Sequence, residues 1–313
     1  MLRGAESLDF LNRLSTHDLK ELGQGRIRPT ILTTDKARII DLVLVLDRGD
    51  QIMLIVSEGN SATIMSWLEK YIIMEEISIT DVTASYKSVS VLGPQAASIA
   101  SHLAGTDVNA LTGSISRLAD GTDLFLYRNP LWTLPVYDIV GNPKAVDLLA
   151  DRLQRPSGGD DGAPGVASGV IDVLRVETGI PQSGKEITDQ VNPLEAGLAR
   201  YVSFTKGCYI GQEVIARIDT YRKLQRNLRG FVFPQGYTDR TPGKLLFDGT
   251  EVGWTTSHVL SHEMGKQIAL GYLKVFPEMS TVGFRKAGST SDLSLEVVDL
   301  PFVSAAPKSG AAA

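Results

Sequence analysis

The sequence has little cysteine: Cys208 is the only one among 313 residues. A single thiol excludes a disulfide framework within the chain and a zinc module built from several cysteines. The sequence also lacks a strong excess of charge of one sign, since 31 basic and 36 acidic side chains give a net charge of −5. This balance disfavours a protein whose main task is to coat nucleic acid or an anionic membrane.

Long apolar runs are absent as well. No stretch approaches the ~20 apolar residues of a membrane-spanning helix, and the longest run, residues 42–46, is typical of a buried strand. The first ten residues lack the apolar run of a secretory signal and already contain Glu6. We therefore expect a soluble, cytoplasmic protein with no membrane partner.

Several catalytic motifs are missing. The sequence contains no P-loop, no GxGxxG after a predicted strand and no GxSxG. His258 and His262 are four residues apart, but they fall in a region of strands and loops, and no glutamate follows His258. Nucleotide-binding folds, hydrolase triads and a metal site therefore have no support.

The apolar pattern predicts a mixture of helices and strands. Pairs of strands alternate with single helices, which favours an α+β fold made of split β-α-β layers. The expected helices span 6–22, 60–71, 94–103, 142–154 and 169–178. The expected strands span 29–34, 39–47, 51–57, 77–82, 86–92, 123–128, 132–139, 227–233, 251–257, 268–275 and 292–298.

Composition changes along the chain indicate the domains. A Pro, Gly and Asp-rich stretch predicts a flexible insertion at 155–168. After residue 226, short strands alternate with Gly and Pro turns, as in a small β-barrel. We expect a first domain over 1–224 that contains the insertion, a barrel over 225–303 and a disordered tail over 304–313.

The segment around Cys208 is the most unusual in the chain. Gly207 and Gly211 bracket the thiol, and a helical pattern begins directly after Gly211. Such glycines permit a tight turn or close approach of a ligand, and a helix start attracts anions. Together with Lys206, this setting could lower the pKa of Cys208 and give it thiolate character. An inert cysteine buried in a tight loop is the alternative.

Two carboxylates are further candidates. Glu177 lies near the end of a predicted helix, where its two oxygens could accept the paired N–H groups of a guanidine-like ring; a solvated charge is the alternative. Asp41 interrupts an apolar strand, so it could face a cavity and act as an acid or base. A plain edge position is the other interpretation of Asp41.

A basic stretch follows the cysteine segment. It could attract an anionic ligand tail or RNA phosphates, or it could be solvated surface. The net charge of −5 favours solvated surface and disfavours nucleic acid as a partner. Its members are Arg217, Arg222, Lys223, Arg226 and Arg229.

Two strings carry a family resemblance. The string KGCYIGQE at 206–213, preceded by LRVETGIP at 174–181, resembles the YgfZ family of folate-binding proteins. That family is related to the glycine-cleavage T-protein, an aminomethyltransferase, and to mitochondrial iron–sulfur assembly factors. Similar matches occur at 10–18 and 33–41, and at 252–272 for a T-protein C-terminal barrel.

The resemblance implies a fold and a function. It implies a T-protein-like ring of subdomains around a funnel for tetrahydrofolate or another folate derivative. Glu177 corresponds to the glutamate that holds the pterin ring, and Lys206 lies near a basic folate-binding residue. Cys208 corresponds to the hallmark thiol, which implies a folate-dependent role in assembly or repair of iron–sulfur proteins, with iron–sulfur client or assembly proteins as partners. The other expected folate-binding residues are Arg175, Gly207, Tyr209, Gly211, Gln212 and Glu213.

Two departures from the T-protein pattern keep alternatives open. T-proteins carry two adjacent aspartates where this chain has Asp41 and Leu42, which weakens the case for a classical aminomethyltransferase. The start is also short for a family whose members usually have a strand before the first helix, so either the start is placed late or that sheet has an unusual edge. The alternatives are a folate-dependent one-carbon transferase with Asp41 and Cys208 as catalytic residues, and a protein linked to tRNA modification.

Overall fold

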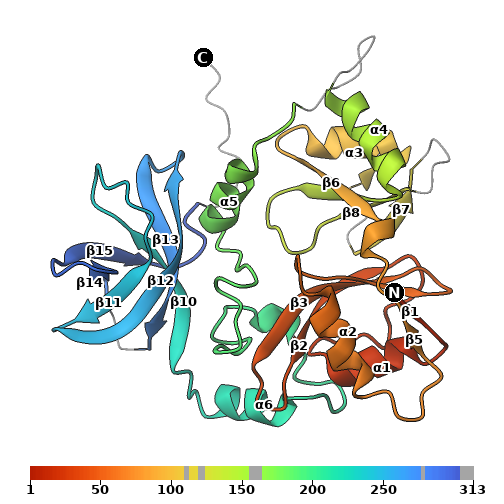
Figure 1. Cartoon of the computed structure of the whole chain (residues 1–313), viewed down its shortest axis with the longest axis horizontal. Coiled ribbons are helices and arrows are strands. Elements are labelled where there is room, and N and C mark those ends of the chain that lie inside the picture. Colours follow the sequence, from red (N-terminus) through yellow and green to blue (C-terminus); the bar gives the residue numbers. More distant parts are fainter. Residues whose placement is uncertain (109–112, 119–123, 155–163, 276–278, 304–313) are drawn as a thin grey trace. The chain divides into compact units, whose positions relative to one another are not determined.

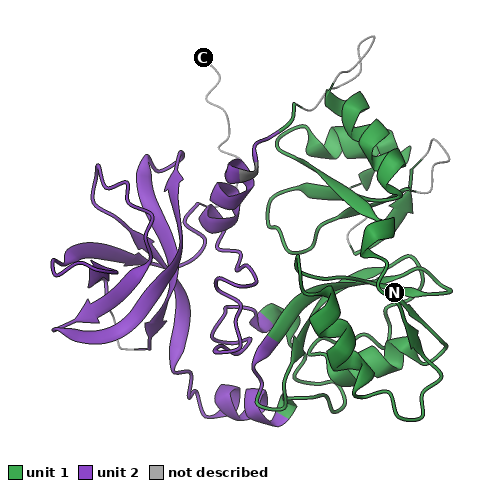
Figure 2. Ribbon diagram, viewed as in Figure 1, with its two compact units in different colours: residues 1–36, 40–165, 200–212 green, residues 37–39, 166–199, 213–313 purple. Residues whose placement is uncertain are grey.

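The structure is a computed structural model that describes residues 1–108, 113–118, 124–154, 164–275 and 279–303. Figure 1 shows its helices and strands, and Figure 2 shows its two compact units. Unit 1 comprises residues 1–36, 40–165 and 200–212, and unit 2 comprises residues 37–39, 166–199 and 213–313. The domain boundary expected at 224–225 and the central funnel stay predictions. None of the described helices is long and apolar enough to cross a membrane.

Unit 1 begins with an antiparallel sheet whose strand order is β2-β3-β4-β1-β5. Two helices pack against it, α1 (Ser7–Leu14) and α2 (Ser61–Glu69). The strands are β1 (Leu2–Arg3), β2 (Ile27–Thr33), β3 (Ile39–Asp47), β4 (Ile52–Ile55) and β5 (Ser78–Ile79). A short strand therefore does precede the first helix, because Leu2 pairs with both Ile52 and Ile79.

A second antiparallel sheet of unit 1 has the order β6-β9-β8-β7. Its strands are β6 (Lys87–Leu92), β7 (Ile115–Arg117), β8 (Leu124–Arg128) and β9 (Val136–Gly141). Helices α3 (Ala96–Ala104) and α4 (Pro143–Gln154) cover one of its faces. A 3-10 turn, η1 (Thr83–Ser85), precedes β6.

Strand β3 shows why the two sheets lie face to face. Its run IIDLVLVLD is buried almost throughout, so both of its faces need an apolar partner. Val43 and Val45 pack in the core beneath α1 and α2. Leu44 and Leu46 point the other way and pack against Tyr127 of the second sheet. Unit 1 is therefore layered as helices, sheet, sheet, helices, which confirms the α+β class.

The first helix is shorter than the expected 6–22, because the chain leaves it at Ser15 in an extended conformation. Polar side chains there bond to the backbone and replace the helical pattern. The Thr16 hydroxyl donates to the Tyr201 carbonyl, and the Asn12 side chain accepts the amide of Leu19. Leu19 still reaches the core from this irregular segment.

Unit 2 is built around a closed six-stranded barrel with the order β10-β13-β12-β11-β14-β15. The strands are β10 (Arg226–Val232), β11 (Gly243–Phe247), β12 (Thr250–Ser261), β13 (Lys266–Lys274), β14 (Thr281–Lys286) and β15 (Leu293–Val298). Two glycines are required where strands approach closely. A Cβ at Gly253 would lie 2.0 Å from the Tyr272 carbonyl oxygen, and one at Gly271 would lie 2.4 Å from that of Trp254.

The remaining elements of unit 2 precede the barrel. They are α5 (Ser168–Glu177), which packs beside β12 and β13, and α6 (Gln212–Thr220), which begins at the last residue of unit 1. A short 3-10 turn, η3 (Ala199–Tyr201), also lies between α5 and α6. Most of the expected insertion, residues 155–163, and the tail 304–313 lie outside the described residues.

Candidate functional site

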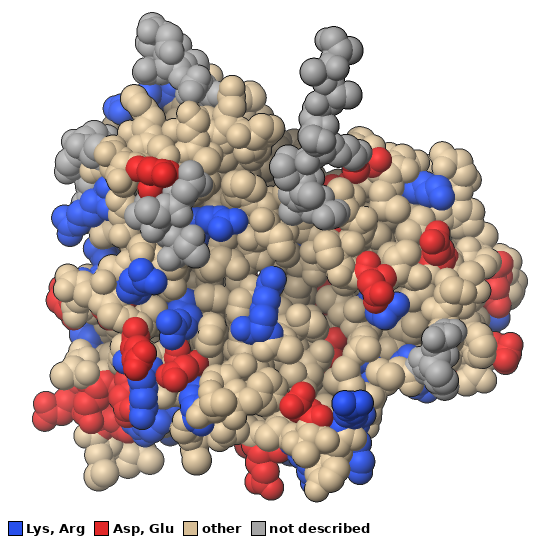
Figure 3. Space-filling view, turned by 180° about the vertical axis from the view of Figure 1, so that it is seen from behind, with Lys and Arg blue, Asp and Glu red and all other residues tan. Residues whose placement is uncertain are grey.

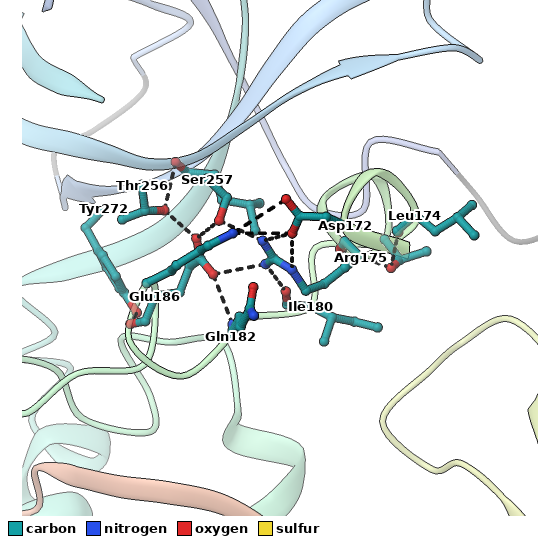
Figure 4. Close-up of polar contacts among 12 residues, drawn as sticks. Asp172, Leu174, Arg175, Ile180, Gln182, Glu186, Thr256, Ser257 and Tyr272 are labelled. Carbon is teal, nitrogen blue, oxygen red and sulfur yellow. Dashed lines mark hydrogen bonds and ion pairs between the residues drawn. The ribbon is translucent and has the colours of Figure 1, made fainter. Parts of the chain in front are cut away.

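Arg175 on α5 is the centre of a buried polar cluster in unit 2 (Figure 4). One guanidinium nitrogen donates to the Glu186 carboxylate at 3.0 Å and to the Ile180 carbonyl at 2.8 Å. The other donates to Asp172 at 2.8 Å and to the Ser257 hydroxyl at 2.7 Å. Arg175 therefore uses its donors within the chain, and these contacts favour a structural role over direct contact with a ligand.

Glu186 completes this cluster and was not expected from the sequence. Its side chain is fully buried and accepts hydrogen bonds from Arg175, the Gln182 amide, and the hydroxyls of Thr256 and Ser257. Four donors around one carboxylate satisfy a buried charge. Glu186 lies in an irregular loop, where the sequence shows no helical or strand periodicity. Its place in the cluster is therefore seen only in the three-dimensional contacts.

A β-bulge in β12 explains how neighbouring hydroxyls reach Glu186. The pairing of β12 with β13 shifts register between Thr255 and His258. In a regular strand, successive side chains point to opposite faces, but a bulge redirects one of them. Here Thr256 and Ser257 both bond to Glu186, as Figure 4 shows.

Glu177 ends α5 and is buried, with an exposed fraction of 7%. The interpretation as a solvated charge is therefore wrong. The Ser261 hydroxyl donates to its Oε1 atom at 2.6 Å. Among the described residues, no donor reaches the second oxygen, Oε2. The backbone carbonyl of Glu177 accepts the Phe302 amide at 2.9 Å, so both main chain and side chain are held.

Lys206 lies in unit 1, where its ammonium group is enclosed by carbonyl oxygens. It donates to the backbone oxygens of Asn12, Ser15 and His17, each at 2.7 Å, at the end of α1. Burial lowers the pKa of Lys206 to about 8, and its ammonium lies 5.0 Å from the centre of the Tyr209 ring. Three protons meet three carbonyls, which favours a structural clamp; contact with folate stays a prediction.

The segment after Lys206 is a tight turn that displays the thiol. Cys208 is a free, exposed cysteine, so the alternative of a buried residue is wrong, and the reactivity of the thiol stays a prediction. Gly211 has a φ of +84°, which favours glycine, and the helix α6 starts directly after it, as predicted. The backbone amide of Gln212 donates to the backbone carbonyl of Tyr209. Tyr209 follows Cys208 in the chain and is buried.

Other expected residues of this segment contribute little to a cavity. Gly207 is exposed, and a Cβ there would meet no atom within 4 Å. Glu213 is exposed in the first turn of α6. Their assignment to folate binding stays a prediction.

Asp41 is fully buried on β3, so the interpretation as a plain edge residue is wrong. Ser57 holds its carboxylate twice, through the hydroxyl at 2.6 Å and the backbone amide at 2.9 Å. The amide of Leu42 also donates to it at 3.0 Å. This carboxylate is rigidly placed, and its role as an acid or base stays a prediction.

The basic stretch is partly neutralised. Arg226 pairs with Glu195 at 3.3 Å, and Arg229 pairs with Asp299 at 2.9 Å. On the face seen in Figure 3, basic and acidic side chains are interspersed. These observations favour an ordinary solvated surface over a phosphate-binding one. Within the described part of the chain, no group of three or more His, Cys, Asp or Glu could hold a metal ion.

Most of the chain matches two known protein-family domains. The GCVT N-terminal domain matches residues 1–206, and the glycine cleavage T-protein C-terminal barrel domain matches residues 226–303. The chain belongs to the glycine cleavage T-protein family. The strand order and the closed barrel described above are thus those of a T-protein fold.

Individual relatives of this T-protein family member agree. An aminomethyltransferase of Desulfitobacterium hafniense is 26% identical over 289 residues, covering 90% of this chain and 77% of the relative. A protein of Arabidopsis thaliana named as a chloroplastic transferase is 29% identical, over 87% of this chain and 62% of its own length. These matches do not separate the YgfZ branch from aminomethyltransferases, so that finer resemblance stays a prediction.

A solved structure shows the same fold. The crystal structure of glycine cleavage system aminomethyltransferase T from Bartonella henselae superposes with a TM-score of 0.79. It is 23% identical and covers 96% of this chain and 82% of its own. At that identity the likeness concerns the fold alone.

Proposed function

We propose that this T-protein relative binds a reduced folate and acts in folate-dependent one-carbon transfer of the aminomethyltransferase class. The family match and the names of the relatives support this class. The observation that carries the proposal is the buried carboxylate of Glu177, which has one oxygen oriented by Ser261 and the other without a protein donor in the described structure.

The chemistry of this carboxylate fits a pterin ring. The ring presents a ring N–H beside an exocyclic amine, and a carboxylate accepts such a pair through its two oxygens. The Oε2 atom has no protein donor among the described residues and is not an enclosed atom left without a partner, so it is open to the N–H groups of a ligand. Arg175 and Lys206 have their donors occupied, so Glu177 is the main folate-binding residue of the proposal.

Asp41 is the proposed proton-handling group. A reduced folate supplies the acceptor of the one-carbon unit when it is bound. The chain's contribution is a carboxylate whose orientation is fixed by two hydrogen bonds from Ser57. A rigidly placed acid or base needs no reorganisation before proton transfer.

The direct test is single-turnover transfer from an aminomethyl-lipoyl carrier to tetrahydrofolate, followed by release of ammonia and formation of methylene-tetrahydrofolate. We expect transfer by the wild type and a loss of at least about a hundredfold in Asp41→Asn, as for removal of a general acid–base group. Asp35→Asn, which changes an exposed aspartate in the preceding loop, is the matched control. Folate binding without any transfer would reject the transferase and favour the candidate below.

A second candidate is a tetrahydrofolate-binding accessory protein for assembly or repair of iron–sulfur proteins. The exposure of Cys208 on the turn before α6 favours it. One thiolate cannot hold a cluster that needs four ligands, so Cys208 would act together with an iron–sulfur partner protein.

Replacement of the thiol tests this second candidate. We expect Cys208→Ala to abolish the accessory function in cells, although the variant protein unfolds at the same temperature as the wild type. Cys208→Ser should lose this function to the same extent. Full complementation by Cys208→Ala would reject the accessory role.

A further inference from the structure

Ser261 is a fully buried hydroxyl at the end of β12. Its Oγ atom accepts the amide N–H of Met264 at 3.0 Å and lies 2.6 Å from the Oε1 atom of Glu177. An ionised carboxylate can only accept, and a backbone amide can only donate. The hydroxyl proton therefore points to Glu177, and its direction is fixed from both sides.

Glu177 differs from Glu186, which bonds to the same strand. Glu186 is enclosed, and its charge is met by several donors. The Oε1 atom of Glu177 has one protein donor, and its Oε2 atom has none among the described residues. Oε2 is not one of the enclosed polar atoms that lack a partner in the described structure, so it is accessible and can accept hydrogen bonds from a ligand.

We infer that Ser261 is a positioning residue that fixes the plane of the Glu177 carboxylate, so that Oε2 and the second acceptor site of Oε1 face the paired N–H donors of the pterin. This inference rests on the proposed folate binding. A positioning role of Ser261 predicts an effect in the Glu177→Gln variant that a hydroxyl with a merely structural role would not produce. In Glu177→Gln, the Ser261 hydroxyl donates to the side-chain amide oxygen and so directs the amide NH₂ group toward the ligand. The NH₂ group then meets the N–H donors of the pterin, and two donors cannot form a hydrogen bond with each other.

Removal of the hydroxyl should then partly rescue Glu177→Gln. Without Ser261, the amide is free to rotate and present its oxygen to the pterin. The double variant Glu177→Gln/Ser261→Ala should bind tetrahydrofolate more tightly than Glu177→Gln alone. Two losses that act independently would instead multiply.

The experiment is an anaerobic calorimetric titration of tetrahydrofolate, with thermal unfolding of each variant to show that it is folded. We expect Ser261→Ala to weaken binding about tenfold, Ser261→Thr to stay within about threefold of the wild type, and the double variant to regain about fivefold over Glu177→Gln. The tenfold loss corresponds to one lost hydrogen bond to a charged group.

The outcomes separate the two claims. Wild-type binding with an unaffected Ser261→Ala, or a double variant weaker than Glu177→Gln, would overturn the role of Ser261 and leave folate binding intact. A folded wild type that binds no tetrahydrofolate would overturn the proposed function and this inference together.

Discussion

Arg175 and Lys206 are the two cations that the sequence associates with folate, and each uses its hydrogen-bond donors on the chain itself. Sequence patterns identify the residue type but not its partner. The acceptors of Lys206 lie about 190 positions earlier in the chain, at Asn12, Ser15 and His17. The place of Glu177 at a helix end, in contrast, could be predicted and is confirmed, and its contact with folate stays a prediction.

We predict that Lys206→Met lowers the free energy of unfolding by about 2–4 kcal/mol, because carbonyls at the end of α1 lose their donor. Urea denaturation measures this change. Lys20→Met, at an exposed lysine, is the control and should have little effect. The folded fraction of Lys206→Met should keep wild-type affinity for tetrahydrofolate; a large loss of affinity would make Lys206 a ligand-binding residue after all.

His258 gives the barrel a dependence on pH. It lies between Phe233 and Phe284, and burial lowers its pKa to about 4, below the ordinary 6.5. Between these values the unfolded chain binds a proton that the folded protein does not, so stability falls as the pH decreases from about 6.5 to 4.

We predict that His258→Phe removes about 2 kcal/mol of the stability difference between pH 7 and pH 5. Denaturation curves at the two pH values measure it. His262→Phe is the control, since that histidine is exposed. An equal loss of stability in the wild type and in His258→Phe would contradict a neutral, buried His258.

Among the elements, β3 was predicted residue for residue, because its nine residues are apolar and mostly β-branched or leucine except for Asp41 and Asp47. Strands β11 and β14 were not predicted, since each is short and mixes glycine with charged residues. The end of α1 was predicted too late, because the leucines at 19 and 22 continue the helical spacing while Ser15 and Thr16 bond elsewhere. Apolar periodicity therefore predicts where buried helices and strands lie, but it predicts poorly the residue at which such an element ends in an irregular segment.

The contact of α5 with β12 depends on the buried pair Arg175 and Glu186. We predict that Glu186→Ala destabilises the protein by about 3–5 kcal/mol, because it leaves the guanidinium buried without its carboxylate. The double variant Arg175→Met/Glu186→Leu should recover most of this loss. Chemical denaturation of the wild type and the two variants measures the effect, and a double variant no more stable than Glu186→Ala would contradict the pairing.

For the whole molecule, the T-protein fold could be predicted from motifs at both ends of the chain, and the family match confirms it. The finer branch could not be settled by the same means, because the resemblance to it rests on the short string at 206–213, and the matched family models are those of the T-protein fold. The proposed function therefore depends on whether this scaffold binds a folate.

Anaerobic titration of tetrahydrofolate into the wild type and Glu177→Gln is the most direct test of that claim. Glu296→Gln, an exposed glutamate on β15, is the matched control. The account predicts saturable binding by the wild type and the control, and binding weakened by about a hundredfold in Glu177→Gln, where a charge-assisted acceptor is lost. Equal affinity in all three proteins would contradict the account.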